Sequence, residues 1–205
     1  MRMLECKCME TRNTLKRIEK SGLSQLLDKC TFDSFNTDYE WQRNARAKAE
    51  MFLQNYQEHW FYAGGQVGSG KTHLCTAIVG TLLKQGKSAR YMLWRDEIVP
   101  LKAMVTDGDE YTKAIDELKT VDVLYIDDFF KTERGKSPTT ADINVAFELL
   151  NYRYINSKLV TIISSERMIN DVLAIDEAVG SRIYQRSKNY CIGIDYDKAK
   201  NYRLK

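Results

Sequence analysis

Eight consecutive residues have the types and spacing of a loop that holds phosphate. They match the pattern G-x-x-x-x-G-K-S/T, and they are Gly65, Gln66, Val67, Gly68, Ser69, Gly70, Lys71 and Thr72. Glycines let successive backbone N–H groups point at phosphate oxygens, and the N-terminus of a following helix adds its dipole. Lys71, which is expected to lie on the surface of the loop, supplies a point charge for the β- and γ-phosphates, and the Thr72 hydroxyl is a ligand for Mg²⁺. We therefore expect these residues to bind a nucleotide.

The residues on either side of this loop supply the elements that must position it. The aromatic run Trp60–Ala63 predicts a buried strand that leads directly into the loop. After the loop, apolar residues recur at helical spacing over 74–82, and Lys84 and Gly86 are helix-stop signals. Strand, loop and helix thus stand in the order that the motif requires. The alternative is a glycine-rich turn that binds nothing.

Two aspartates offer the second half of such a site. Asp127 and Asp128 directly follow the apolar run 121–126, which predicts a strand buried on both faces. A carboxylate at that strand end, beside the phosphate loop, holds Mg²⁺ in P-loop NTPases, and we assign this role to Asp127. Asp128 points elsewhere and is the candidate general base for the attacking water. The alternative is a strand that ends in solvated aspartates.

A further strand, 159–164, ends in polar residues that include Glu166. Polar side chains there are positioned to contact the γ-phosphate or the water, and an ordinary strand end is an equal alternative. Other strands are expected at 89–94 and 190–194, and helices at 39–56, over 95–119, from Ser137-Pro138, and over 168–188. Alternating strands and helices predict an α/β fold with a five-stranded parallel sheet and helices on both faces.

Bulk properties suit one domain. The chain has 205 residues and a net charge of +3, and its five cysteines are scattered as in reduced cytosolic proteins. No apolar run reaches about 18 residues, so we expect a cytoplasmic protein without a membrane partner. Residues 1–37 are expected to form a basic N-terminal extension, and 38–205 the nucleotide-binding core.

Taken together, the motifs resemble the AAA+ ATPases of the DnaC, DnaI and IstB types, particularly phage-type helicase loaders. The resemblance covers most of the chain. It rests on the phosphate loop and on 125–130, 161–165 and 180–184, with 19–23 and 31–35 ahead of them.

The resemblance implies roles for individual residues. Lys71 and Thr72 correspond to the Walker A lysine and Mg²⁺ ligand, and Asp127 and Asp128 to the Walker B pair. Glu166 falls at sensor 1, where the family usually has asparagine, so no catalytic role is assigned to it.

Three further positions follow from the resemblance. Arg182 falls at the arginine finger, which implies self-association through the ATP site, and its side chain is expected to project outward while Ile183 and Tyr184 pack inward. Phe32 and Phe35 resemble the segment near the adenine. Because the sequence stops just after the fifth strand, neither a C-terminal helical lid nor a sensor 2 arginine is expected.

The implied function is ATP hydrolysis by a loader of the replicative helicase, with ATP and Mg²⁺ as ligands. The alternatives are an IstB-type transposition helper, a small-molecule P-loop kinase, and an adaptor that binds ATP without turnover. Loaders also contact single-stranded DNA, yet the insert 95–119 is net acidic. Lys131, Arg134 and Lys136 form a better basic cluster, or simply a solvated loop.

Cys6 and Cys8 look like the end of a zinc-binding segment found in some relatives. A structural zinc needs four ligands, and neither His59 nor His73 is placed to complete the set. We therefore expect no metal at these cysteines.

Overall fold

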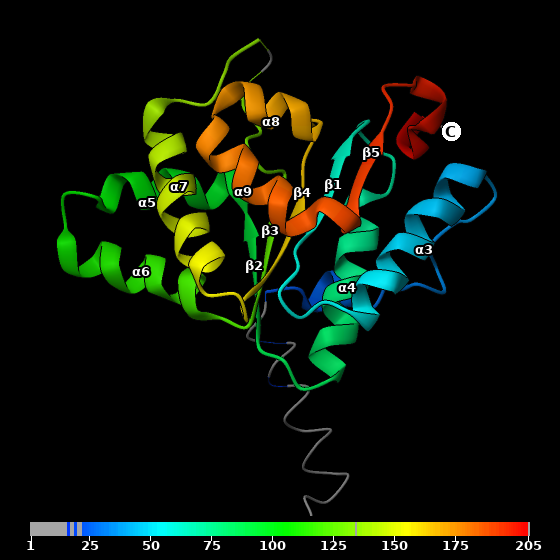
Figure 1. Cartoon of the computed structure of the whole chain (residues 1–205), viewed down its shortest axis with the longest axis horizontal. Helices are drawn as coiled ribbons and strands as arrows, with labels where there is room; N and C mark the ends of the chain where they lie inside the picture. The colour runs from blue at the N-terminus through cyan, green and yellow to red at the C-terminus, as the bar shows by residue number, and fades with distance from the viewer. Residues whose placement is uncertain (1–15, 17–18, 20–21, 134, 205) are drawn as a thin grey trace, which may run out of the picture.

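Five parallel strands form a single sheet in the order β2-β3-β4-β1-β5 (Figure 1). The computed structural model describes residues 16, 19, 22–133 and 135–204. The strands are β1 (Phe61–Gly65), β2 (Ala89–Leu93), β3 (Val123–Asp127), β4 (Val160–Ser164) and β5 (Cys191–Ile194). Because β4 pairs with both β1 and β3, it lies between the strand before the phosphate loop and the strand that ends in the aspartates.

Helices cover both faces of the sheet, as expected from the alternating pattern. On one face lie α2 (Ser24–Leu27), α3 (Glu40–Gln54) and α4 (Lys71–Lys84). On the other lie α5 (Trp94–Met104), α6 (Gly108–Thr120), α7 (Thr140–Ile155), α8 (Ile169–Ile175) and α9 (Glu177–Ser187). Phe61 and Ala63 of β1 pack into the first layer and Tyr62 into the second, which is the alternation of a strand buried on both sides. The predicted fold class is confirmed.

Several apolar side chains of the segment 22–37, which the sequence analysis assigned to an N-terminal extension, pack against the core. Leu23 has no exposed surface, and Leu26 and Leu27 of α2 contact the same apolar cluster. A methyl group at Gly80 of α4 would lie 2.8 Å from the Leu27 side chain, so α2 and α4 are in close contact. The segment from Leu23 to Phe35 is therefore fixed against the helix that follows the phosphate loop.

Helix α7 begins two residues later than the Ser137-Pro138 signal predicted. Its N-cap is Thr139, whose hydroxyl accepts a hydrogen bond from the Asp142 amide at 3.2 Å. The Asp142 carboxylate in turn accepts the Thr139 amide at 2.8 Å, which completes a capping box. Lys102 of α5 also reaches Asp142, with 2.6 Å between Nζ and Oδ1. This reciprocal cap places the helix start at Thr140, and Pro138 precedes it.

A buried arginine joins α7 to the sheet. Arg153 has no exposed surface, and burial lowers its pKa to about 9. Its hydrogen-bond acceptors are the Thr161 hydroxyl and the backbone carbonyls of Leu118, Lys119, Val121 and Val160. The guanidinium thus satisfies the C-terminal carbonyls of α6 and holds α6 and α7 against β4.

Replacing this arginine should destabilise the fold. We expect Arg153→Met to lower the free energy of unfolding by about 3 kcal/mol or more, because each buried carbonyl left without a donor costs about 1–3 kcal/mol. Urea unfolding followed by circular dichroism measures the change. The matched control is Arg95→Met on the exposed face of α5, which should shift stability by less than about 0.5 kcal/mol. Equal unfolding midpoints for the two variants would contradict the structural role of Arg153.

Candidate nucleotide-binding site

The phosphate loop connects the end of β1 to the start of α4. Gly65 is the last residue of β1 with φ of 104°, and a Cβ there would lie 2.0 Å from the Ile194 carbonyl oxygen. Gly70 is the N-cap of α4 with φ of 89°. Both positions require glycine, since a side chain is strained at these angles and at Gly65 has no space. The loop therefore turns tightly enough to direct its amides, and the N-terminus of α4, into one concave surface.

Lys71 is buried within this loop, which corrects the expectation that it lies on the surface. Lys71 is 8% exposed, and its Nζ donates to the carbonyl oxygens of Gly65 at 2.8 Å and Gln66 at 2.6 Å. Ser69 supports the same turn through a 2.7 Å bond from its hydroxyl to the Gln66 carbonyl. Burial lowers the pKa of Lys71, although the charges of Glu166 and Asp128 oppose this shift. The ammonium is thus held at the cavity by neutral acceptors that a phosphate oxygen can replace.

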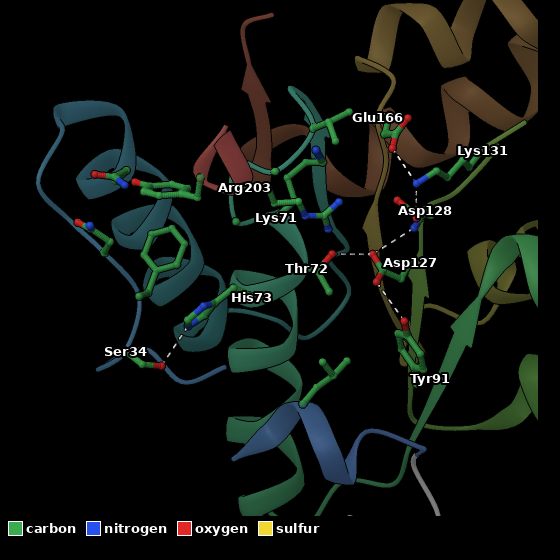
Figure 2. A pocket seen from close by; sticks show the side chains of 18 residues that line it. Ser34, Lys71, Thr72, His73, Tyr91, Asp127, Asp128, Lys131, Glu166 and Arg203 are labelled. Atoms are coloured by element: carbon green, nitrogen blue, oxygen red, sulfur yellow. Dashed lines mark hydrogen bonds and ion pairs between the residues drawn. The ribbon is translucent and has the colours of Figure 1, made fainter. Parts of the chain in front are cut away.

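Asp127 lies opposite the loop, and Figure 2 shows the hydroxyl groups of Thr72 and Tyr91 directed at its carboxylate. It is 4% exposed, and it accepts hydrogen bonds from Thr72 and Tyr91 at 3.1 Å each and from the Ser164 hydroxyl. Burial next to this carboxylate raises the pKa of Tyr91, so the phenol stays protonated and donates. The Thr72 contact joins the phosphate loop to β3, and the oxygen atoms of Thr72 and Asp127 are the kind of hard ligand that Mg²⁺ prefers.

The sequence predicted that Asp128 points elsewhere than Asp127, and in the structure the two carboxylates have different partners. The Asp128 φ of 53° is left-handed, which a non-glycine residue rarely adopts and which aspartate tolerates best. Its carboxylate forms an ion pair with Lys131 at 2.8 Å, and Lys131 also pairs with Glu166 at 2.8 Å. Figure 2 shows these three side chains on the side of the cavity that faces Lys71.

The loop and both aspartates line one cavity of about 520 Å³. Phe35, Asn36 and Gln42 line it as well, and the Phe35 ring lies beside Gly70. Phe32 is not among the residues that line this cavity; it packs against the apolar core cluster, with the Arg46 guanidinium over its ring. Of the two phenylalanines expected near an adenine, only Phe35 is placed to contact a bound nucleotide.

The structure adds two cavity residues from the C-terminal segment that sequence reasoning missed. Tyr202 and Arg203 lie in the 3₁₀ turn η3 (Tyr202–Leu204), which contacts the phosphate loop through a 2.9 Å bond from the Tyr202 amide to the Gly68 carbonyl. Trp41 of α3 contacts the Tyr202 ring, with 6.5 Å between centroids. No local sequence pattern predicts these residues, because their contact with the phosphate loop joins segments that are far apart in the sequence.

Arg182 lies against α7 and does not project outward as predicted. Its Nε donates to Asn151 Oδ1 at 3.0 Å, and its guanidinium lies 4.8 Å from the centroid of the Phe147 ring. Ile183 is buried as expected, whereas Tyr184 is 43% exposed and does not pack inward. Arg182 is not among the residues that line the cavity of its own chain.

Other predicted sites find less support in the described residues. The lysines of the expected basic cluster are already paired, Lys131 with two carboxylates and Lys136 with Glu133 at 2.6 Å. Between residues 22 and 204, leaving out 134, no group of three His, Cys, Asp or Glu side chains is arranged to hold a metal ion. Cys6, Cys8 and Arg134 lie outside the described residues.

No helix in the part of the chain that the structure describes is both long and apolar enough to span a membrane.

The fold and the cavity together define the class of protein. A parallel α/β sheet carries a phosphate loop between β1 and α4 and a buried carboxylate at the end of β3, with β4 between them. This arrangement is that of a P-loop nucleotide-binding protein. The chain belongs to the IstB-like ATP binding protein family, whose model matches residues 5–205.

Individual relatives agree with this assignment. YqaM of Bacillus subtilis strain 168 is 32% identical over 210 residues, which cover 98% of this chain and 66% of YqaM. The replicative helicase loader DnaC of Escherichia coli strain K12 is 30% identical over 127 residues, 60% of this chain and 51% of DnaC. A crystal structure of the DnaC helicase loader matches the fold with a TM-score of 0.66 at 19% identity, covering 82% of this chain and 97% of that one.

Proposed function

We propose that this chain hydrolyses ATP with the help of Mg²⁺. The observation that carries the proposal is the 3.1 Å contact between Thr72 of the phosphate loop and Asp127 at the end of β3, with Lys71 and Asp128 in the same cavity. The family is ATP-binding, and the cavity brings together a phosphate loop with its lysine, oxygen ligands suited to Mg²⁺ and a candidate general base.

Different residues of the chain bind the phosphates, bind Mg²⁺ and activate the water. The loop amides and Lys71 hold the β- and γ-phosphates, while the oxygens of Thr72 and Asp127 fit Mg²⁺. When bound there, Mg²⁺ supplies positive charge to the phosphate oxygens. Asp128 orients a water molecule and accepts its proton as the water oxygen bonds to the γ-phosphorus. The bond from that phosphorus to the β–γ bridging oxygen breaks, which yields ADP and inorganic phosphate.

Asp128→Asn separates turnover from binding. Asparagine tolerates the left-handed backbone at this position, so the variant should fold. ATP should still bind through Lys71, Thr72 and Asp127, whereas turnover should fall by about 10²–10⁴-fold because the proton acceptor is lost. Phosphate release measures the rate and isothermal titration measures ATP affinity. The comparison variant is Asp127→Asn, which should weaken Mg²⁺-dependent ATP binding, and equal loss of affinity in both variants would contradict the division of roles.

The biological role that we propose is loading of a hexameric replicative helicase. The support is the similarity to DnaC, which covers about half of that protein, together with the helicase-loader resemblance of the motifs. Co-purification of the chain with its cognate replicative helicase, with and without ATP, tests this role. Recovery of the helicase only when ATP is present would support a nucleotide-dependent loader, and recovery in neither condition would count against it.

Other roles predict different results in the same preparations. An IstB-type transposition helper, favoured by the family match, should bind a transposase in place of a helicase. A small-molecule kinase would require an acceptor for turnover, whereas an ATPase releases phosphate without one. An adaptor would bind ATP and release no phosphate. Single-stranded DNA as a further partner is tested by its effect on the ATPase rate.

A further inference from the structure

The loop that follows Asp127 has an unusually constrained backbone. Asp128 and Phe130 both have left-handed φ, 53° and 56°, although neither is glycine. The rings of Phe129 and Phe130 are stacked with 4.1 Å between centroids, are fully buried, and pack against Trp94. Such backbone conformations persist only where the surroundings enforce them, and they concentrate at functional sites. The buried phenylalanines therefore fix the direction in which Lys131 leaves the loop.

The Lys131 ammonium lies between two carboxylates on the wall of the nucleotide cavity. Its Nζ is 2.8 Å from Asp128 Oδ2 and 2.8 Å from Glu166 Oε1, and all three residues line the cavity. Burial disfavours the charge, yet the bonds to these carboxylates raise the pKa of Lys131 above its ordinary value. The group is therefore a stable cation at neutral pH.

Glu166 is held in place independently of this pair. Its backbone carbonyl accepts a 3.0 Å bond from the Tyr196 hydroxyl, and the preceding Ser165 amide donates to the Ala63 carbonyl at 2.9 Å. The Ser165 hydroxyl donates to the Phe129 carbonyl at 2.7 Å, which ties the end of β4 to the loop that carries Lys131. The backbone that carries Glu166 is therefore fixed by contacts that do not involve Asp128, and its carboxylate is a second partner for Lys131.

The charges on this wall of the cavity determine how it interacts with a bound triphosphate. Asp127, Asp128 and Glu166 place three carboxylates on the wall opposite the phosphate loop, and these repel phosphate. The charges of Asp128 and Glu166 also act on Lys71, so this wall lies near the phosphate end of the cavity. Lys131 is the lysine on that wall, and an ammonium group with three donors can exchange one acceptor and keep another.

We infer that Lys131 binds the γ-phosphoryl group of ATP, with Glu166 as the residue that positions it. In the structure the Lys131 ammonium pairs with the Asp128 carboxylate. A γ-phosphate oxygen replaces Asp128 as its partner, which frees the Asp128 carboxylate to hold the attacking water, while Glu166 retains the lysine. ADP has no γ-phosphate and therefore cannot replace Asp128 as the partner of Lys131. The inference rests on the proposed ATPase function.

The test compares the affinities for AMPPCP, a non-hydrolysable ATP analogue, and for ADP in the presence of Mg²⁺. Lys131→Met should weaken AMPPCP binding by about 10-fold or more, leave ADP binding within about 2-fold, and lower turnover by about 100-fold. Lys131→Arg should restore part of the preference for AMPPCP. The control is Lys136→Met on the same loop, which pairs with Glu133 outside the cavity and should match the wild type.

Glu166→Gln tests the positioning role. It should reduce the preference for AMPPCP over ADP and lower kcat more than it raises KM, because the lysine loses its second anchor. Equal weakening of AMPPCP and ADP by Lys131→Met, or an unchanged affinity ratio, would overturn the inference. The wild-type arm reports on the ATPase function separately: if wild type binds and hydrolyses ATP, an unchanged Lys131→Met ratio counts against the role of Lys131 alone.

Discussion

Lys71→Ala is expected to abolish productive ATP binding and hydrolysis. The Lys71 ammonium is held at the cavity by two loop carbonyls, and a triphosphate would replace these with charged acceptors. A hydrogen bond to a charged group contributes about 1.5–3 kcal/mol, so losing two should weaken ATP binding by at least about 100-fold. Isothermal titration and phosphate release measure both quantities.

A matched control separates this effect from a change in the fold. Because Lys71 is buried, its removal leaves the Gly65 and Gln66 carbonyls without that donor, which should cost about 1–3 kcal/mol of stability. Lys84→Ala removes an exposed lysine from the other end of α4 and should leave ATP binding and turnover at the wild-type level. A Lys71→Ala variant that hydrolyses ATP at the wild-type rate would overturn the central assignment.

The second large effect concerns Arg182, which we propose enters the ATP site of a neighbouring subunit. Arg182 does not line the cavity of its own chain, and its guanidinium lies on α7, over the Phe147 ring and bonded to Asn151. An arginine supplied in trans is worth about 10³-fold or more in rate. We therefore expect Arg182→Ala to lose turnover by about that factor and to keep its affinity for ATP, and wild-type activity to rise more than linearly with protein concentration.

Mixing two inactive variants is the sharper measurement. Lys71→Ala keeps the arginine but lacks a working site, and Arg182→Ala keeps the site but lacks the arginine. Where they meet at an interface, the combined proteins should recover part of the activity. Arg182→Gln controls for packing, because it keeps much of the side chain and a donor for Asn151 but removes the charge; it should be as inactive as Arg182→Ala.

An inactive mixture of subunits that demonstrably assemble together would show that Arg182 does not act in trans. Arg186 would then be the next candidate. Its Nη2 donates to the Ser157 carbonyl at 2.6 Å and its guanidinium lies over the Trp60 ring, so it would have to leave these contacts to reach a neighbour.

Local sequence was sufficient for the phosphate loop and for the order of elements around it. Glycine, lysine and threonine at fixed offsets, between a buried strand and a helix, predicted the loop because its conformation is encoded by neighbouring residues. Strands alternating with helices predicted the parallel sheet for the same reason. The boundary of α7 was missed because a reciprocal cap between Thr139 and Asp142 outweighed the Ser137-Pro138 signal.

Contacts between residues distant in sequence were decided only by the tertiary structure. No periodicity or motif predicts three of these contacts. They are the hydrogen bond from Tyr91 to Asp127, the ion pair of Lys131 with Glu166, and the position of Arg203 in the cavity lining. Arg182 was predicted to project outward, yet it lies on α7. Its guanidinium stacks over the Phe147 ring and donates a hydrogen bond to the Asn151 side chain. The sequence determined that the chain has a phosphate loop and a carboxylate strand end. Only folding decided which other charges surround them, since the sheet order β2-β3-β4-β1-β5 places the ends of β1, β3 and β4 side by side.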